Sequence, residues 1–376
     1  MPFSPAGIKF ITMRPGPKKS ILKRIEILGR KGLMKLFGLM HPKRTFSELP
    51  PDAPRRKILL MRQDKLGDMA VTLPYFRALK KVLPDSEIAI LASRRNKILL
   101  KYEMGFRQII YDKRPHKFLL SLWQVFRFHP DVVVDLQLKE SATSTIYVLA
   151  SRAKWRIRAV RPVKLPFNVW VPIGDDWHIR REMETLIGTV APLDVNSVPQ
   201  EIKLSEREQA FAIKFFSTLQ VPKNRLVGLN ISAGKPERTL SVPEYSSICY
   251  GVLRRGFVPV ILYAPQDKSR ARQIVSYPHT RGAVLAPETP DVLCAIALVR
   301  ELFALITPDT SMVHFASAMG VPVLALYTAN DWNCNRWLPW GVPYRFCQSK
   351  DHDTMEGISI DEVLAKFDEL VAEISR

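Results

Sequence analysis

Short apolar runs alternate with longer amphipathic stretches along most of this chain, beginning at Lys57. Runs of about four to eight aliphatic residues are typical of buried strands, whereas apolar positions spaced three or four apart predict helices. The predicted strands of the first half are Ile58–Met61, Glu87–Ala92, Gln108–Tyr111, Asp131–Leu136 and Arg156–Val160. The predicted helices there are Met69–Val82, Asn96–Met104, Lys117–Phe128, Ser141–Ala150 and Ile179–Thr189, and Pro162–Asp176 is expected to be irregular.

A polar link around Asp194–Pro199 leads into a second half with the same alternation. Its predicted strands are Leu226–Ile231, Val258–Tyr263, Ala283–Leu285, Glu301–Ile306 and Val321–Tyr327. Its predicted helices are Glu206–Leu219, Pro243–Arg254, Asp267–Ser276, Pro290–Val299, Ser311–Met319 and Ile360–Ile374. Strands that alternate with helices imply parallel βαβ units. The chain is therefore predicted to be an α/β protein with two Rossmann-like, doubly wound domains that face each other across a cleft.

The helix predicted at Ser311–Met319 has clear end signals, with Asp309 or Thr310 as N-cap and Gly320 just past its end. It opens beyond the carboxyl end of a strand, where free N–H groups and the helix dipole favour a phosphate. His314 lies in its first turn, on the rim of the same crevice. The alternative is that these residues are ordinary caps and a packed histidine.

The loop after the first strand, Arg62 to Asp68, places a carboxylate at the edge where doubly wound sheets bind ligands. Gly67 permits a tight turn before the helix. Neither the GxGxxG nor the GxxxxGK[ST] pattern is present, which argues against a dinucleotide fingerprint or a P-loop. Asp68 is a candidate general base, with a helix cap as the alternative.

The loop Asn230–Thr239 follows the first strand of the second half, and its Lys235 and Arg238 suit a phosphate. Asp267, after the next strand, is placed to accept hydrogen bonds from ribose hydroxyls. Each loop alone is also compatible with a solvated turn. Together with Asp309 and Thr310 they predict a nucleotide site.

The net charge of +20 over 376 residues implies an anionic partner. Residues 1–57 contribute 14 Lys or Arg against three acids. Ser20–Met40 is compatible with a basic amphipathic helix that suits an anionic membrane, or with a solvated leader, and the Pro50–Pro54 cluster marks a linker. The four cysteines form no CxxC pair, which argues against a zinc knuckle and favours a reducing compartment.

A set of residues spread from the first loop to the last strand resembles the bacterial lipopolysaccharide heptosyltransferases, glycosyltransferase family nine. The residues that carry the resemblance are Arg62–Asp68, Thr72–Pro74, Leu79, Lys80, Pro84, Asp131–Leu136, Ser232–Arg238, Asp309, Thr310, His314, Ala316, Ala318, Gly320 and Pro322. The resemblance implies a GT-B fold with a leader and linker (1–56), an acceptor domain (57–196), a nucleotide-sugar domain (197–358) and a terminal helix (359–376) packing back on the acceptor domain.

The resemblance further implies an inverting, metal-independent transfer without a cofactor, in which Asp68 deprotonates the acceptor hydroxyl. It assigns the acceptor-side loop to Arg62, Lys65 and Gly67. The implied donor residues are Ser232, Ala233, Gly234, Lys235, Arg238, Asp267, Asp309, Thr310, Ser311, Met312 and His314. The resemblance implies a nucleotide-sugar donor, for which ADP-heptose is the first choice. The implied acceptor is a phosphorylated, lipid-linked core glycan at the cytoplasmic face of the inner membrane.

Two departures from the family pattern bear on the substrates: Ser311 stands where the family commonly has Gly, and Arg238 to Pro243 replaces a Lys-x-Trp-Pro run. A nucleotide-sugar 2-epimerase of the same build, acting without an acceptor, remains an alternative. A degenerate scaffold is disfavoured by Asp68 and His314. A nucleic-acid-binding protein is disfavoured because the basic residues gather in a leader rather than among stacking aromatics.

Overall fold

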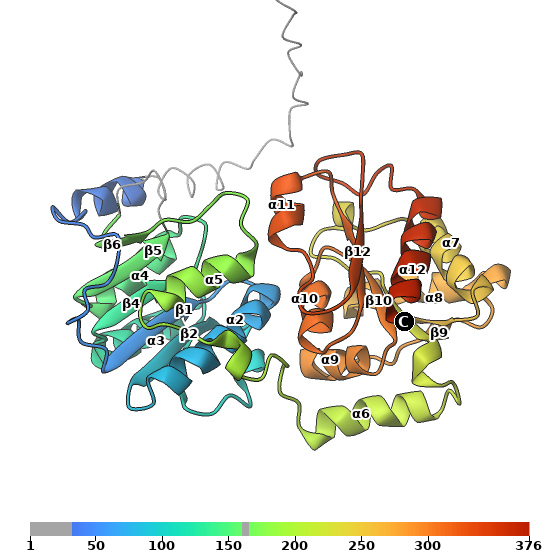
Figure 1. The fold of residues 1–376 in the computed structure, drawn as a ribbon, viewed down its shortest axis with the longest axis horizontal. Helices are drawn as coiled ribbons and strands as arrows, with labels where there is room; N and C mark the ends of the chain where they lie inside the picture. The colour runs from blue at the N-terminus through green and yellow to red at the C-terminus, as the bar shows by residue number, and fades with distance from the viewer. Residues whose placement is uncertain (1–31, 160–164, 376) are drawn as a thin grey trace, which may run out of the picture.

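The computed structural model describes residues 32–159 and 165–375, which form two parallel six-stranded sheets (Figure 1). The first sheet contains β1 (Lys57–Arg62), β2 (Glu87–Ser93), β3 (Phe106–Tyr111), β4 (Val132–Asp135), β5 (Trp155–Ala159) and β6 (Val169–Val171). The second contains β7 (Leu226–Asn230), β8 (Val258–Leu262), β9 (Val284–Leu285), β10 (Ala304–Pro308), β11 (Val323–Tyr327) and β12 (Tyr344–Gln348). This confirms the predicted α/β fold with two doubly wound domains.

The strand order is β3-β2-β1-β4-β5-β6 in the first sheet and β9-β8-β7-β10-β11-β12 in the second. Both sheets therefore reverse direction of winding between their first and fourth strands. A doubly wound sheet binds ligands at this point, outside the carboxyl ends of the strands. Each sheet thus supplies one edge for a site, β1/β4 in the N-terminal domain and β7/β10 in the C-terminal domain.

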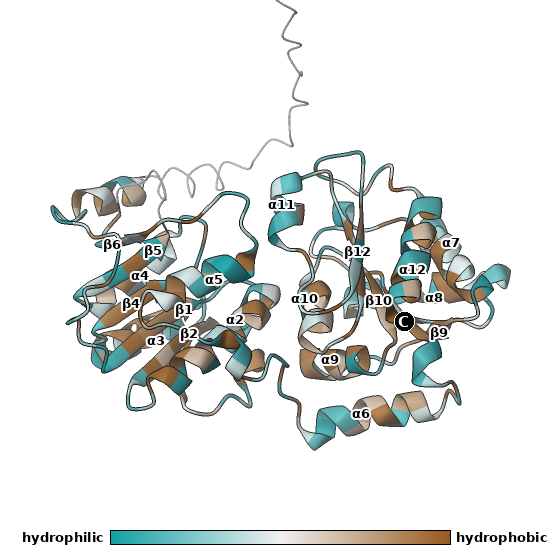
Figure 2. Cartoon of the chain, in the orientation of Figure 1, coloured by the Kyte–Doolittle hydropathy of each residue, from teal (hydrophilic) through white to brown (hydrophobic). Residues whose placement is uncertain are grey.

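The longer helices cover both faces of each sheet. In the first domain they are α2 (Leu66–Val82), α3 (Pro115–Phe128), α4 (Ala142–Ser151) and α5 (Ile179–Gly188). In the second they are α6 (Glu206–Ser217), α7 (Val242–Arg254), α8 (Lys268–Ser276), α9 (Val292–Arg300), α10 (Ser311–Ala318), α11 (Asp331–Arg336) and α12 (Ile360–Ile374). Figure 2 shows the strands and α9 mostly in brown and α5 mostly in teal, as expected for buried strands under amphipathic helices.

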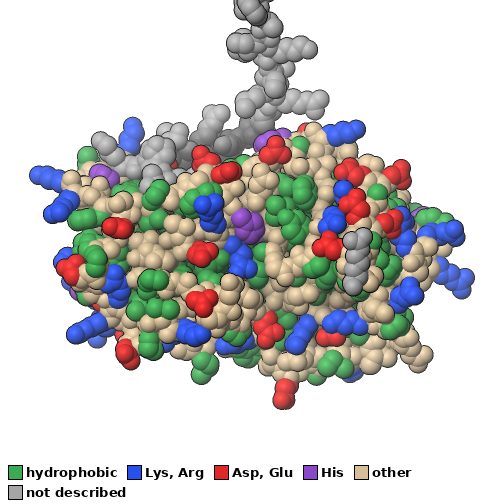
Figure 3. Space-filling view, in the orientation of Figure 1, with side chains coloured by type: hydrophobic (Ala, Val, Ile, Leu, Met, Phe, Trp, Pro, Cys, Tyr) green, Lys and Arg blue, Asp and Glu red, His purple; other side chains and the backbone are tan. Residues whose placement is uncertain are grey.

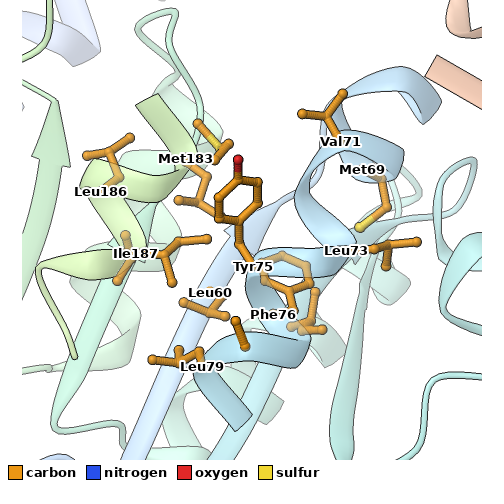
Figure 4. Packing of buried hydrophobic residues seen from close by; sticks show 14 of the residues in the cluster. Leu60, Met69, Val71, Leu73, Tyr75, Phe76, Leu79, Met183, Leu186 and Ile187 are labelled. Carbon is orange, nitrogen blue, oxygen red and sulfur yellow. The ribbon is translucent and has the colours of Figure 1, made fainter. Parts of the chain in front are cut away.

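The first domain is held together by α2 and α5 on one face of its sheet. Tyr75 and Phe76 of α2 lie among Leu60 of β1 and Met183 and Ile187 of α5, all fully or almost fully buried (Figure 4). Burying one such aromatic side chain contributes roughly 1.5–3 kcal/mol. This packing fixes the amino end of α2, and with it the position of Asp68.

Two predictions about individual elements are wrong, and two elements were missed. Asn96–Met104 forms only a 3-10 turn, Lys97–Leu100, because the Asn96 side chain instead bonds the backbone of Ser93 and Arg62. Pro162–Asp176 contains the short strand β6, which pairs with β5 and bridges to Phe46. The strand β12 and helix α11 were not predicted at all. For the 3-10 turn and the two strands, side-chain bonding or strand pairing overrides the local pattern. The helix α11 is short and is capped locally by Asn330.

The terminal helix α12 also differs from expectation. Its Val363, Phe367 and Leu370 are buried in the core of the second domain, where the helix packs on α7 and β12. It therefore caps the second domain rather than packing back on the first domain, as the resemblance had implied.

Part of the basic leader packs on the first domain. Residues 32–39 are helical, and Phe37 is buried on the sheet face opposite α2. Leu49 and Ala53, in the predicted linker, are buried in the core beneath α2 and α5. The rest of the predicted Ser20–Met40 helix, up to residue 31, lies outside the described residues. Within residues 32–159 and 165–375, no helix has both the length and the apolarity needed to cross a membrane.

The two domains touch along a continuous interface in which α2 lies against α10, and in the space-filling view they merge into one body (Figure 3). Phe315, Ala318 and Trp340 of the second domain join the main core of the first. A buried Glu182–Arg336 ion pair crosses the interface, and Nε2 of His178 donates to the carbonyl oxygen of Leu338 at 2.9 Å. The loops at the two sheet edges are therefore held against each other.

Candidate active site

The loop after β1 gathers charge around one buried arginine. Arg62 donates from Nη1 to Asp64 at 3.2 Å and to the Leu136 carbonyl, and from Nη2 to Asp68 at 3.4 Å. Its Nε donates to the backbone oxygen of Asp68 at 3.1 Å. Arg62 therefore fixes both the backbone and the carboxylate of the predicted base.

Asp68 occupies the third position of α2, which begins three residues earlier than predicted. Its carboxylate accepts a hydrogen bond from the Lys65 backbone N–H at 3.3 Å, and Thr72 donates to its backbone oxygen at 2.6 Å. The carboxylate is thus oriented by a helix start without being the N-cap itself, and about a tenth of its side chain remains exposed. A small part of the carboxylate therefore remains accessible to solvent beside the contact with the second domain.

The neighbouring Asp64 is the unusual acid of this loop. Burial raises the pKa of Asp64 to about 7, against the opposing effect of Arg62, and the charges of Asp68 and Asp135 raise it further. Asp135 is itself paired with the buried Arg158. Close carboxylates on one arginine cannot all ionise easily, because each charge disfavours the next.

The second edge is built from neutral polar groups. Asn230 at the end of β7 donates from Nδ2 to Thr307 at 2.9 Å and to the Ser232 carbonyl at 3.1 Å. Thr310 caps α10 by accepting from the Met312 N–H at 3.2 Å, as predicted, and Gly320 follows the helix with a φ of 72°. Hydroxyl and amide side chains thus hold the amino end of α10 at the carboxyl edge of β10.

Charged residues flank this helix start. Asp309 accepts from Asn333 at 2.7 Å and from Arg238 at 3.3 Å. Burial raises the pKa of Asp309, while Asn333, Arg238 and the nearby Lys65 lower it and Asp68 raises it. The charges of Lys65 and Asp68 act on Asp309 because the two edges face each other. Arg238 therefore lies at the start of α10, whereas the side chain of Lys235, in the same loop, is exposed to solvent.

The remaining residues of the predicted donor site follow the carboxyl ends of β7 and β8. Asp267 accepts from Ser232 at 2.6 Å and from Arg270 at 3.2 Å, so its two oxygens are engaged within the protein. Ala233 is half-buried, and a Cβ at Gly234 would meet nothing within 4 Å. Ser232, Asp267 and Arg270 form one side of the predicted nucleotide site.

The two edges meet at Gly67. A Cβ placed there would lie 2.8 Å from Cδ2 of His314 and 3.4 Å from Cα of Ser311. Any larger residue at this position would therefore collide with α10. The close approach requires glycine, and it brings Asp68 to the amino end of α10 across the domain boundary.

His314 is a buried interface residue rather than an open ligand-binding group. It is 4% exposed, and its ring lies 5.5 Å from that of Trp337. Burial lowers the pKa of His314 to about 3, and His178 and Arg62 add to the effect. Its Nδ1 has no hydrogen-bond partner among the described residues. The imidazole is neutral and packs over Gly67.

Sequence reasoning missed several residues that complete this arrangement. Asn230 donates to the backbone oxygen of Ser232 and, at 3.4 Å, to the hydroxyl of Thr310. Asp64, Asn333 and Arg270 form side-chain hydrogen bonds with Arg62, Asp309 and Asp267, respectively. Asp64 and Asn230 lie in the two loops that the sequence already singled out, and the polar run around Asn333 follows a strand of the second sheet. The chain's Asp-x-Asp sequence, Asp351 to Asp353, lies in an exposed turn in which Asp351 accepts backbone N–H groups of Asp353 and Thr354.

The chain matches known glycosyltransferases both in sequence and in fold. The model of glycosyltransferase family 9 (heptosyltransferase) matches residues 135–364. The lipopolysaccharide core heptosyltransferase OpsX of Haemophilus influenzae is 20% identical over 290 residues, covering 75% of this chain and 80% of that protein.

Solved structures show the same GT-B architecture. A family 9 glycosyl transferase from Veillonella parvula has a TM-score of 0.72 at 18% identity, covering 87% of this chain and 99% of its own. The E. coli ADP-heptose LPS heptosyltransferase II has a TM-score of 0.65 at 17% identity, covering 85% and 100%. These likenesses establish the fold, and the family match spans more than half of the sequence. The chain is a glycosyltransferase and belongs to glycosyltransferase family 9, the heptosyltransferase family.

Proposed function

We propose that this enzyme transfers a heptose from ADP-heptose to a phosphorylated, lipid-linked core glycan, with inversion and without a metal ion. The observation that carries the proposal is the contact of the Gly67–Asp68 turn with the amino end of α10. One side of that contact offers a carboxylate, and the other offers helix N–H groups with Arg238 nearby. These are the two groups that a displacement at a nucleotide-sugar requires.

In the proposed reaction an acceptor hydroxyl lies between Asp68 and the donor sugar. An Asp68 carboxylate oxygen takes the hydroxyl proton as the oxygen attacks the anomeric carbon from the face opposite the diphosphate. The bond from that carbon to the phosphate oxygen breaks, and ADP leaves with the electron pair. A single displacement of this kind inverts the anomeric configuration.

Negative charge develops on the leaving diphosphate, and the second edge is suited to stabilise it. The start of α10, Arg238 and the exposed Lys235 and Lys65 provide positive potential there. The nucleoside would extend along Ser232 and Asp267 on the open side of β7. Such a site neutralises the diphosphate with protein groups alone.

The identity of the donor and acceptor rests on the relatives. OpsX is named as a lipopolysaccharide core enzyme, and the E. coli relatives are named for ADP-heptose and for a complex with ADP. The direct test is to incubate the full chain with ADP-heptose and a phosphorylated, lipid-linked lipopolysaccharide core acceptor in EDTA. The expected product is heavier by one heptosyl unit, with the anomeric configuration inverted by NMR. Loss of transfer in EDTA, or conversion of the free nucleotide-sugar without acceptor, would contradict the proposal.

We also propose that the basic leader contacts the anionic inner surface of the membrane. Because Phe37, Leu49 and Ala53 are buried in the first domain, the deletion that tests this should stop at residue 31. The shortened chain should bind anionic vesicles more weakly while retaining transfer to a water-soluble acceptor. Unchanged vesicle binding would argue against a role for the leader.

A further inference from the structure

The helix α3 has a second apolar face that the protein core does not use. Its Ser121, Val125 and Phe128 are buried on the sheet. On the outer side Leu119, Trp123 and Phe126 follow one another at helical spacing, with Leu120 beside them. These four are 64%, 57%, 44% and 47% exposed, respectively. Large exposed side chains grouped on one helix face mark an interaction surface, whereas singly scattered ones do not.

The exposed charges on this helix are positive, and Asp112, which precedes it, is paired with Arg114. The helix Pro115–Phe128 contains no Asp or Glu, while Lys117 and Arg127 lie on its exposed side and Lys113 precedes it. Arg127 lies 5.7 Å from the ring centre of Trp123, and Arg152 lies 4.3 Å from that of Phe126. The apolar stripe is therefore bordered by cations. Aromatic rings with adjacent Arg or Lys are typical of surfaces at a membrane interface.

A second group of exposed apolar residues lies on the same side of the first sheet. Helical residues 32–39 pack on the same side of the first sheet as α3 and α4, through Phe37. They and the turn that follows leave Leu36, Leu39 and Met40 exposed, next to Lys35 and Lys43. Two separate segments thus present apolar side chains with basic neighbours on one face of the domain.

The direction of α3 relates this face to the active site. A helix that connects parallel strands runs antiparallel to them, so the amino end of α3 lies at the carboxyl edge of the sheet. Asp68 follows β1 at that same edge. A surface held against this face would therefore be close to the acceptor side of the cleft.

We infer that the outer face of α3 inserts into the interfacial region of an anionic lipid bilayer, with Leu119, Leu120, Trp123 and Phe126 among the acyl chains. Lys113, Lys117, Arg127 and Arg152 contact the lipid phosphates. This inference rests on the proposed function in one respect: binding through this face would bring the active site to a lipid-linked acceptor. It assigns membrane binding to a folded surface in addition to the leader.

The test measures binding of the full chain to vesicles without donor or acceptor, so its outcome is independent of catalysis. The vesicles contain phosphatidylcholine alone or with phosphatidylglycerol, and binding is followed by co-sedimentation. The double substitution Leu119→Ser with Trp123→Ser should weaken binding to the anionic vesicles by about tenfold, because apolar burial is lost. The matched control is Ile213→Ser on α6, a residue 58% exposed on the other domain, which should bind as wild type does.

Three results would overturn the inference. One is vesicle affinity of the double variant equal to that of the control. Another is a wild-type dimer that becomes a monomer in the double variant by light scattering, which would make the face a contact between copies. The third is faster proteolysis of residues 1–31 in the double variant at unchanged vesicle affinity, which would assign the face to the protein's own leader. Transfer to a water-soluble acceptor should be the same in all three proteins.

Discussion

The two sheets have the same strand order but different chemistry at the same edge. Beyond β1 and β4 lies a charged cluster of Arg62, Asp64, Asp68, Asp135 and Arg158. Beyond β7 and β10 lie the amide and hydroxyl side chains that hold a helix start. An equivalent fold therefore does not dictate an equivalent role, because the residues after the strands decide it.

The difference follows from what each edge must do with charge. A carboxylate that serves as a base has to be held firmly yet remain able to accept a proton. In the proposed function Arg62 and the start of α2 hold Asp68 in this way. A diphosphate carries its own negative charge, so a site that binds it needs hydrogen-bond donors. Thr310, Asn230 and the start of α10 supply such a setting without bringing in further acids. Asp309 is the one acid named at this edge, and its carboxylate accepts hydrogen bonds from Asn333 and Arg238.

The largest expected effect comes from removing the proposed base, Asp68, at the first edge. Asp68→Asn keeps the side-chain shape and an acceptor for the Lys65 N–H, but it cannot take a proton. The turnover number should fall by about 10²- to 10⁴-fold while ADP affinity stays within about twofold of wild type. Steady-state transfer assays and calorimetry measure the two quantities. Full turnover in this variant would remove Asp68 from the chemistry.

The second prediction separates the two edges physically. Gly67→Ala places a methyl group 2.8 Å from the His314 ring and should push α10 away from α2. Misplacing the reacting groups in this way should lower turnover by about ten- to hundredfold. Small-angle scattering should show a less compact molecule. Gly32→Ala, whose Cβ meets nothing within 4 Å, is the matched control.

A third prediction compares the two candidate phosphate ligands of the second edge. Arg238→Ala should weaken ADP binding by about tenfold, because a charge-assisted contact near α10 is lost. Lys235→Ala should weaken it by only about threefold, since an exposed, flexible cation contributes less. Titration of both variants measures the ratio. A larger loss of ADP affinity in Lys235→Ala than in Arg238→Ala would mean that Lys235, rather than Arg238, is the main phosphate ligand.

The smallest effect concerns pH and the interface histidine. The folded-state pKa of His314, about 3, lies below the ordinary value of 6.5. As pH falls below that ordinary value the unfolded chain binds a proton that the folded one does not. The contribution of His314 to stability is therefore fully present above about pH 6.5 and is lost progressively as the pH falls toward 3.

His314→Gln should remove this part of the acid sensitivity. Urea midpoints at about pH 7 and about pH 5 should differ less in His314→Gln than in wild type. His116→Gln, which changes an exposed histidine, should keep the wild-type difference. An equal pH dependence in all three proteins would mean that His314 accepts a proton while folded.

The strands and most helices were predictable because the spacing of apolar residues and the capping residues at helix ends are local features of the sequence. Thr310 as a cap and Gly320 past the helix end are of this kind. The position of Asp68 at a strand end was equally accessible, since the loop follows a clear strand. What the pattern alone left open was the choice between a ligand site and ordinary caps.

The contacts between distant segments were not predictable. Asn333 reaches Asp309 from an unpredicted helix, and Arg62 joins Asp64 to Asp68 in a geometry that the loop sequence does not specify. His314 suited a phosphate rim by position, yet its contact with Gly67 depends on how the two domains dock. Such features depend on tertiary packing, for which a single sequence gives no direct signal.

The measurement that tests the account most directly is calorimetric titration of ADP, UDP and GDP in EDTA on wild type, Asp68→Asn and Asp309→Ala. The account predicts selective, metal-free binding of ADP that is retained in Asp68→Asn and weakened about tenfold in Asp309→Ala, because only the second edge holds the nucleotide. Loss of ADP binding in Asp68→Asn with full binding in Asp309→Ala would contradict the division of roles between the two edges.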